Sequence, residues 1–321
     1  MEISDLYYFP LSSEHNILYN HCKKIYFEHR LMSIKQIGVC AILVASLMWA
    51  IEPIFVKFAY KNADFIQTSA IRAICITLIA FIYILITNKK SFAIKKKHLP
   101  SLIYLGAIGT LADLLYYFSL TKIPVLNAVL IGHMQPIFII LIGFFVLKDD
   151  SLTKHDYIGI SIMIVAAFLV TTKTPYNLVT LRLGSTGDIF VLFATIAWAS
   201  TAIVMRKYLK DLHAGILSFY RYMIASIIFI TYLSLSSSLK VSNYYQILVG
   251  VIVGIGVILY YEGLKRIKAA QVGALELATP FFAAILGFLI LKELVSTMQF
   301  IGIISLVVGI YFLSIKEETY F

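Results

Sequence analysis

Five charged residues lie inside long apolar stretches of the chain: Glu52, Arg72, Asp113, Arg221 and Glu276. A charge in an apolar surrounding is costly unless it is paired or hydrated, so each is a functional candidate by default. The arginines can bind a carboxylate, either on a solute or on the protein itself. The acids can bind a proton. This chemistry is typical of a path for polar solutes through a membrane.

Each of these charges also has a structural interpretation. Arg72 and Arg221 fall within about two turns of a predicted helix start, where an arginine can snorkel to the surface or form a structural ion pair. Glu52 is compatible with a structural pair to Arg72 or to Lys57. The sequence leaves the functional and the structural interpretation open for all three.

Glu52 is accompanied by an aromatic residue and by a residue that loosens a helix. Trp49 lies three residues earlier, which places both side chains on one helix face. Pro53 follows and removes one backbone hydrogen bond. An acid, an indole and a kink together suit the wall of a cavity in which the carboxylate binds a proton. Trp198 is the second tryptophan, and we expect it to line the same cavity.

Further polar residues extend this set in the next apolar stretches. Asp113 lies at mid-depth, which makes it a second candidate proton carrier. His133 titrates near neutrality and could relay a proton, although a lone histidine among apolar residues is more often a packing residue. Gln135, beside Pro136, is a candidate polar contact with a solute.

The composition places most of the chain in a lipid bilayer. Hydrophobic residues make up 60% and charged residues 14%, and the mean hydropathy is +0.88. Soluble domains carry about 25% charged residues. The formal net charge is +10, but the cations lie in short loops and no RNA-binding motif is present, so we expect no nucleic-acid partner. No enzyme, cofactor or metal-site motif occurs, and we predict no enzymatic activity, no cofactor and no metal.

Ten apolar runs are long enough to cross a bilayer as helices. They lack the period-two alternation of a membrane barrel, and only helices satisfy their own backbone groups in lipid. The sequence therefore predicts an all-α, multi-pass membrane protein of ten transmembrane helices. The predicted spans are 37–59, 65–87, 99–120, 126–147, 156–172, 186–206, 214–234, 244–264, 269–291 and 297–315.

The second half of the chain repeats the first. Residues 115–147 read LYYFSLTKIPVLNAVLIGHMQPIFIILIGFFVL, and residues 259–291 read LYYEGLKRIKAAQVGALELATPFFAAILGFLIL. Pro136 and Pro280 are equivalent in this alignment, and we predict that both kink helices bordering the path. The two tyrosine pairs fit either anchors at the membrane interface or side chains that stack on a substrate.

The repeat includes the candidate site. Trp49 is equivalent to Trp198, and Arg72 to Arg221, each pair being separated by 149 positions. Each unit contains five predicted helices, an odd number, so the second unit must enter the membrane from the opposite side. The sequence thus predicts two five-helix inverted repeats with a substrate cavity between them, near the midplane of the bilayer.

These units define the predicted domain organisation. The first repeat covers 37–172 and the second 186–315, with a cytoplasmic tail at 316–321. Residues 1–36 are expected to form a poorly ordered cytoplasmic tail, and Met32 offers an alternative translation start. Most Lys and Arg residues fall on the side of the two termini, which favours a cell-membrane protein with both termini in the cytoplasm.

The duplication and the helix count together resemble the drug/metabolite transporter superfamily, specifically its ten-helix members with two EamA domains. The resemblance covers about residues 36–316 and is strongest in Leu115–Asp149 and its repeat Leu259–Glu293. In both, a Tyr-Tyr pair leads to a short loop, a helix with a central proline, and Leu-Lys followed by an acid. The resemblance implies alternating-access transport of small organic solutes, since members include amino-acid exporters, nucleotide-metabolite carriers and drug pumps.

We therefore predict a gradient-driven secondary transporter of small organic metabolites such as amino acids, with protons as a candidate coupling ion. The alternatives are a multidrug exporter or a lipid or metabolite flippase on the same fold, and a passive channel. The sequence leaves the substrate, the direction, the coupling ion and the oligomeric state open. The predicted substrate- or proton-binding residues are Trp49, Glu52, Arg72, Asp113, His133, Gln135, Trp198, Arg221 and Glu276, and the predicted gating prolines are Pro53, Pro136 and Pro280.

Overall fold

The computed structural model describes residues 34–87, 92–147, 154–180, 184–209, 211–236, 239–264, 266, 275–276 and 278–314. Regular structure throughout these ranges is helical. The two predicted tails lie outside them, apart from residues 34–36.

Eight long helices follow the predicted spans closely. They are α2 (Ile34–Ala59), α3 (Phe65–Thr87), α4 (Leu99–Ser119), α7 (Lys154–Thr172), α9 (Thr186–Tyr208), α10 (Ala214–Ser236), α11 (Tyr244–Leu264) and α14 (Thr297–Ser314). The two other predicted spans are interrupted: one contains α5 (Val125–Gly132) and α6 (Gln135–Leu147), and the other contains α13 (Ala278–Leu286) and the π-helix η2 (Gly287–Leu291). The structure adds two short loop helices that were not predicted, η1 (Lys96–His98) and α8 (Pro175–Val179).

Within the described ranges, seven helices are long and apolar enough to cross a membrane. Three shorter apolar helices, Tyr157–Val170, Ala278–Leu291 and Thr297–Gly309, fall in the remaining predicted spans. Many large apolar side chains on these helices are exposed, Leu235 and Phe145 among them, as expected for a surface that contacts lipid. The chain is a multi-pass, all-helical membrane protein, as the sequence predicts.

The three predicted kink prolines behave differently. α2 continues through Pro53 without a break. The fourth predicted span breaks at His133 and Met134, just before Pro136, which has no N–H to donate to the preceding turn. Pro280 is the third residue of α13, in the corresponding part of the second half. A role for these prolines in gating stays a prediction.

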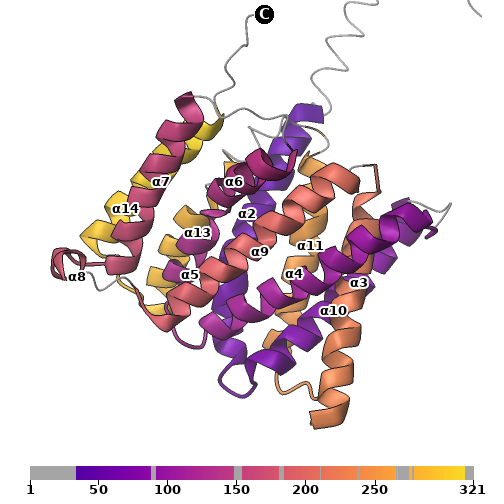
Figure 1. The fold of residues 1–321 in the computed structure, drawn as a ribbon. Coiled ribbons are helices and arrows are strands. Elements are labelled where there is room, and N and C mark those ends of the chain that lie inside the picture. The colour runs from indigo at the N-terminus through magenta and orange to yellow at the C-terminus, as the bar shows by residue number, and fades with distance from the viewer. Residues whose placement is uncertain are drawn as a thin grey trace, which may run out of the picture.

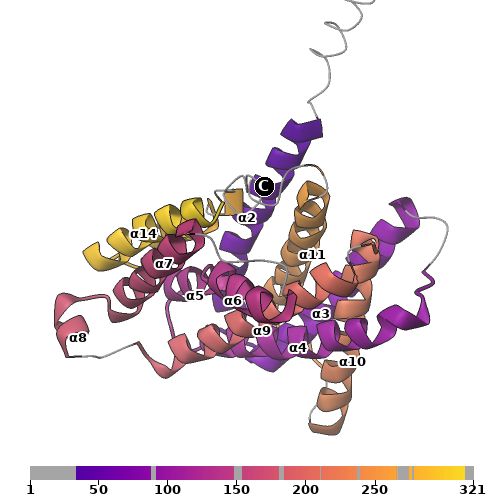
Figure 2. The same ribbon diagram turned by 45° about the horizontal axis from the view of Figure 1, so that its top comes forward.

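Most of the helix packing joins the two halves of the chain. α2 packs on α11, and the equivalent helices α9 and α4 pack on each other. α3 packs on α10 and α7 on α14, each pair being equivalent helices. In Figures 1 and 2, α7 and α14 lie side by side at one edge of the bundle, with α5 and α13 between them and the remaining helices. Exchanging the two halves therefore reproduces the same set of contacts.

Single residues follow the same exchange symmetry. The hydroxyls of Thr77 and Ser226, which are 149 positions apart and equivalent in the repeat, lie 3.2 Å from each other at the contact of α3 with α10. A contact between two equivalent residues lies on the axis that relates the halves. That axis passes through the α3–α10 interface.

The two halves run in opposite directions. Tyr60, just after α2, donates its hydroxyl to the carbonyl of Tyr117 near the end of α4, at 2.7 Å. The ring of Phe118 packs 5.1 Å from the ring of Phe190, near the start of α9. α2 therefore ends on the side where its equivalent, α9, begins. The halves are inverted relative to each other, as predicted.

On this side of the molecule, the second half caps a helix of the first. The carboxylate of Glu293, which follows η2, accepts hydrogen bonds from the backbone N–H groups of Val125 at 2.9 Å and Leu126 at 3.2 Å. These are the first two residues of α5, whose N–H groups have no partner within the helix. The negative charge also lies favourably at the positive end of the helix dipole.

A buried amide joins three helices close to this cap. Asn127 donates its side-chain N–H to Asp188 of α9 at 3.1 Å and accepts one from Gln299 of α14 at 2.7 Å. Asp188 and Gln299 in turn form reciprocal capping bonds with Ser185 and Ser296, which begin those helices. The side on which α2 ends is thus closed by polar contacts between the halves.

Candidate functional site

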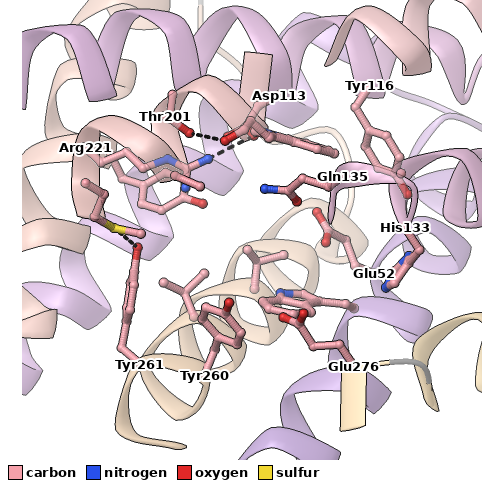
Figure 3. Close-up of a pocket in the computed structure, with 18 of the residues that line it drawn as sticks. Glu52, Asp113, Tyr116, His133, Gln135, Thr201, Arg221, Tyr260, Tyr261 and Glu276 are labelled. Atoms are coloured by element: carbon pink, nitrogen blue, oxygen red, sulfur yellow. Dashed lines mark hydrogen bonds and ion pairs between the residues drawn. The ribbon is translucent and has the colours of Figure 1, made fainter. Parts of the chain in front are cut away.

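A cavity of about 240 Å³ lies between the two halves. Helices α2, α3, α4, α5 and α6 line it from the first half, and α9, α10, α11 and Glu276 line it from the second (Figure 3). All nine side chains predicted to bind substrate or protons line this one cavity: Trp49, Glu52, Arg72, Asp113, His133, Gln135, Trp198, Arg221 and Glu276. Their binding roles stay predictions. The nine residues come from seven of the ten predicted spans, and no single span indicates that they converge on one cavity.

Asp113 is the centre of a charge network. One carboxylate oxygen accepts a hydrogen bond from Nη1 of Arg72 at 2.8 Å. The other oxygen accepts from Nε1 of Trp198 at 2.9 Å and lies 3.3 Å from Nη2 of Arg221. The residue is only 3% exposed. A buried carboxylate is stabilised when charged donors surround it, so Asp113 holds both arginines in place.

Arg72 has two acidic partners. Besides Asp113, it places Nε 3.3 Å from Oε1 of Glu52, which also accepts a 2.6 Å hydrogen bond from the Tyr117 hydroxyl. Its guanidinium lies over the rings of Tyr117 and Tyr222, 4.9 Å and 5.5 Å from their centroids. Arg72 is thus paired inside the bundle and does not snorkel.

Lys57, the alternative partner of Glu52 in the sequence, binds elsewhere. Its ammonium donates to the backbone carbonyl of Ile123 at 2.7 Å. Of the two structural partners that the sequence offers for Glu52, the structure selects Arg72.

Arg221 has fewer partners than Arg72, although the two are equivalent in the repeat. It shares the Asp113 carboxylate at 3.3 Å and forms a hydrogen bond with Tyr261, and its Nε, like that of Arg72, has no hydrogen-bond partner among the described residues. The guanidinium lies over the Tyr222 ring at 4.9 Å and flat against Gly109, where an added Cβ would approach Nε to 3.0 Å. Its side chain is 16% exposed, compared with 6% for Arg72. Arg221 therefore has hydrogen-bonding capacity left over at the cavity.

Glu276 lies on the opposite side of the cavity from Arg221 (Figure 3). The Tyr260 hydroxyl forms a hydrogen bond with its carboxylate. Among the described residues, no arginine, lysine or histidine forms an ion pair with Glu276, unlike Glu52 and Asp113. Within the part of the chain that the structure describes, Glu276 is the cavity acid without a cationic partner.

Two aromatic pairs face each other across the exchange axis. The rings of Trp49 and Tyr260 are 5.1 Å apart at 52°, and those of Trp198 and Tyr116 are 5.2 Å apart at 52°. Each pair takes its tryptophan from one half and its tyrosine from the other. The tyrosines left open by the sequence, Tyr116 and Tyr260, therefore face the cavity and do not serve as interface anchors.

The break between α5 and α6 brings polar groups to the cavity. His133 caps the end of α5, and its Nδ1 lies 2.8 Å from the carbonyl of Val129. Gln135 begins α6. One nitrogen of His133 is thus satisfied by its own helix, and the ring still lines the cavity.

The sequence analysis missed Tyr222, whose ring contacts both arginines. Its equivalent in the first half is Ala73, so the repeat does not mark it. Its position directly after Arg221 is the signal that could have found it. The cap formed by Glu293 was also missed, although the repeated Leu-Lys-acid motif contains that residue.

Known proteins share this fold. Uncharacterized transporters of Methanothermobacter thermautotrophicus and Archaeoglobus fulgidus are 30% and 24% identical, over 63% and 84% of this chain. The matched part covers 60% of the first relative and 95% of the second. The pseudopaline exporter CntI of Pseudomonas aeruginosa is 22% identical over 44% of this chain and 48% of its own length. A solved crystal structure superposes with a TM-score of 0.63 at 14% identity, over 86% of this chain and 96% of that chain, which supports the fold alone.

Both halves also match one family. Residues 36–172 and 185–315 each match the EamA-like transporter family, in agreement with the resemblance to the drug/metabolite transporter superfamily. The two matches cover nearly every described helix, including all those that line the cavity. The chain belongs to the EamA-like transporter family.

Proposed function

We propose that this protein is a gradient-driven secondary transporter that moves small organic metabolites, such as amino acids, through its central cavity. The observation that carries the proposal is the location of that cavity. It lies between two inverted halves, and it holds five charged side chains, three of them buried, that a purely structural bundle does not need.

The inverted halves support a mechanism of alternating access. Contacts between the halves close the side where α2 ends, through the Glu293 cap and the Asn127 bonds. Inverted halves can exchange conformations, which gives a second state that is closed on the opposite side. A solute in the cavity would then face each side of the membrane in turn.

The size of the cavity favours single metabolites. At about 240 Å³ it lies below the range of about 300–1,000 Å³ that is typical of drug-sized ligand sites. The sequence contains no phosphate-binding loop for ATP, so a solute or ion gradient must supply the energy. We propose protons as the coupling ion, with the carboxyl groups of Glu52, Asp113 and Glu276 as their available acceptors.

We place the protein in the cell membrane with both termini in the cytoplasm. The excess of Lys and Arg on the terminal side supports this orientation. Single cysteines introduced at Lys61 and at Lys207 would test it in intact cells, because these residues lie at opposite ends of helices. A membrane-impermeant maleimide is expected to label residue 61 and to spare residue 207, and the reverse pattern would contradict the orientation.

Transport itself can be measured with purified protein in liposomes. A panel of radiolabelled amino acids, nucleosides and organic cations is offered, with and without an imposed pH gradient. We expect saturable uptake of one solute class, stimulated when the same unlabelled solute is loaded inside. Arg266→Gln, which removes an arginine paired with Glu262 outside the cavity, is the matched control and should transport normally.

Two results would overturn the proposal. Flux that does not saturate and is not stimulated by internal solute would indicate a channel. Absence of flux for the whole panel, together with protein-dependent scrambling of fluorescent phospholipids, would indicate a flippase.

A further inference from the structure

The cavity has one strong site for an anion, and it belongs to Arg221. Of the two cavity arginines, Arg72 is held by the carboxylates of Glu52 and Asp113. Among the described residues, Arg221 has one acidic partner, Asp113, at 3.3 Å, besides a hydrogen bond with Tyr261. A guanidinium has five N–H donors and binds carboxylates in pairs of parallel hydrogen bonds. The N–H groups of Arg221 that bind no protein atom can donate hydrogen bonds to the carboxylate of a solute.

The cavity also has one site for a cation, and it belongs to Glu276. The other acids, Glu52 and Asp113, each have an arginine partner, whereas among the described residues Glu276 has only the Tyr260 hydroxyl. A carboxylate without a counter-charge inside a membrane protein is unfavourable even when it is only partly buried, as Glu276 is, so a cation from the solute would relieve it. Trp49 packs 5.1 Å from Tyr260, and aromatic rings attract a protonated amine.

The charge balance of the cavity leads to the same conclusion. Glu52, Arg72, Asp113 and Arg221 form one connected network with two charges of each sign. Among the described residues Glu276 has no cationic partner, so the cavity has an unmatched acid on one side and, on the other, an arginine with a single acidic partner (Figure 3). A solute with both charges satisfies both positions and adds no net charge to the membrane interior.

We propose that the cavity binds a small zwitterion, with its carboxylate on Arg221, its protonated amine on Glu276 and its apolar remainder between the two tryptophan–tyrosine pairs. This inference rests on the proposed transport function and specifies the substrate class of the same cavity. The volume of about 240 Å³ suits one amino-acid-sized solute.

The test uses a series of compounds that lose one charge at a time. Leucine, phenylalanine and methionine are the zwitterionic probes. Each has an amide, which removes the carboxylate charge, and an N-acetyl form, which removes the amine charge. Purified full-length protein in liposomes takes up the radiolabelled solute, and inhibition of this uptake by each compound gives the affinity of that compound. For at least one of the three amino acids, we expect both modified forms to bind at least tenfold more weakly, because each loses a charge-assisted hydrogen bond.

Two variants assign each charge to its residue. In Arg221→Gln we expect the penalty for the amide to fall below threefold, while the penalty for the N-acetyl form persists. In Glu276→Gln we expect the penalty for the N-acetyl form to fall below threefold, while the penalty for the amide persists. Arg266→Gln and Glu262→Gln remove a matched ion pair outside the cavity and should keep both penalties. Arg221→Lys keeps the charge, so it should retain part of the penalty if Arg221→Gln fails to fold.

The outcomes separate this inference from the function on which it rests. If amino acids do not inhibit but a nucleoside or an organic cation is transported, the zwitterion site is wrong and the transporter stands. If an amino acid is transported and neither cavity variant changes the discrimination, the assignment to Arg221 and Glu276 is wrong. If no solute is transported, the proposed function fails as well.

Discussion

Arg72 and Arg221 occupy equivalent positions in two inverted halves, yet their surroundings differ. Arg72 lies between two carboxylates and is 6% exposed, whereas Arg221 shares one carboxylate and is 16% exposed. The duplicated residue is thus held by two acids in the first half and by one in the second, where we propose that it binds a ligand. Duplication placed the same guanidinium group in both halves, and the neighbouring residues determine how many acidic partners each one has.

The neighbours that decide it are the acids. Glu52 is equivalent to Thr201, and Asp113 to Val257, so the second half has lost or never acquired both carboxylates. The first half consequently provides the counter-charge for both arginines. In the aromatic shell the halves have stayed alike, with the same ring separation and tilt in each tryptophan–tyrosine pair.

The largest expected difference between the halves is in stability. Arg72→Gln leaves Glu52 and Asp113 buried beside each other, and we expect a loss of about 3–5 kcal/mol in the free energy of unfolding. Arg221→Gln leaves Asp113 paired with Arg72, so the loss should be about 1–2 kcal/mol. Unfolding of both variants in the same detergent, followed by circular dichroism, measures the difference. Equal losses would show that the two arginines are equally structural.

The paired glycines of the repeat test the packing symmetry. An added Cβ at Gly250 would lie 2.4 Å from Cys75 and 3.1 Å from backbone atoms of Arg72. At the equivalent Gly106, it would meet only the side chain of Ile224, at 2.7 Å. We expect Gly250→Ala to cost about 3 kcal/mol and Gly106→Ala about 1 kcal/mol, because a backbone yields less readily than a side chain.

Thermal unfolding of the two alanine variants is the measurement. Gly256→Ala is the matched control, because its Cβ would make only ordinary contacts, at 3.4 Å and beyond. A larger loss of stability in Gly106→Ala than in Gly250→Ala would mean that the Arg72 backbone can shift freely.

The sequence could predict those features of the fold that depend on local composition or on the internal repeat. Long apolar runs and the repeated LYY motif were enough to predict the helical class, the helix bounds within a few residues and the inversion of the halves. The repeat also marked Arg72 and Arg221 as equivalent. Each of these conclusions depends on local composition or on self-similarity, which a single chain displays.

The partners of the charged residues could not be predicted in the same way. Asp113 meets Trp198 and Arg221 across separations of 85 and 108 positions, and nothing in the pattern along the chain encodes these contacts. The break at His133 was also not located, because a proline in a membrane helix is often accommodated without one, as at Pro53. Residues without an equivalent in the repeat, such as Tyr222, were not marked by the repeat, and only the position directly after Arg221 pointed to this one.

The use of Arg221 by a ligand can be tested by making its surroundings resemble those of Arg72. Thr201 lines the cavity at the position equivalent to Glu52, which pairs with Arg72. Thr201→Glu should give Arg221 an acidic partner of its own and weaken solute binding about tenfold, or by about 1.4 kcal/mol. Thr201→Gln adds similar volume without the charge and serves as the control. Equal weakening by both variants would point to volume and not to competition for Arg221.

The smallest expected effect concerns the contact that closes one side of the cavity. Glu293 caps α5 across the two halves, whereas Asp64 caps α3 within its own half through a 2.7 Å bond from the Gln67 N–H. Replacing either acid by alanine should cost about 1 kcal/mol of stability. Only Glu293→Ala should also favour opening of the side where α2 ends, because only this cap joins parts that must separate there.

That opening can be followed with one reporter cysteine at Ala128, which lines the cavity on α5, in a chain whose three native cysteines are replaced. A membrane-impermeant maleimide is applied from each side of the membrane in turn. From the side where α2 ends, we expect labelling about fivefold faster in Glu293→Ala, since about 1 kcal/mol shifts a two-state equilibrium by about that factor. Asp64→Ala should leave the rate unchanged. If both variants label at the wild-type rate, Glu293 stabilises α5 alone, and closure of this side depends on the buried Asn127 bonds to Asp188 and Gln299.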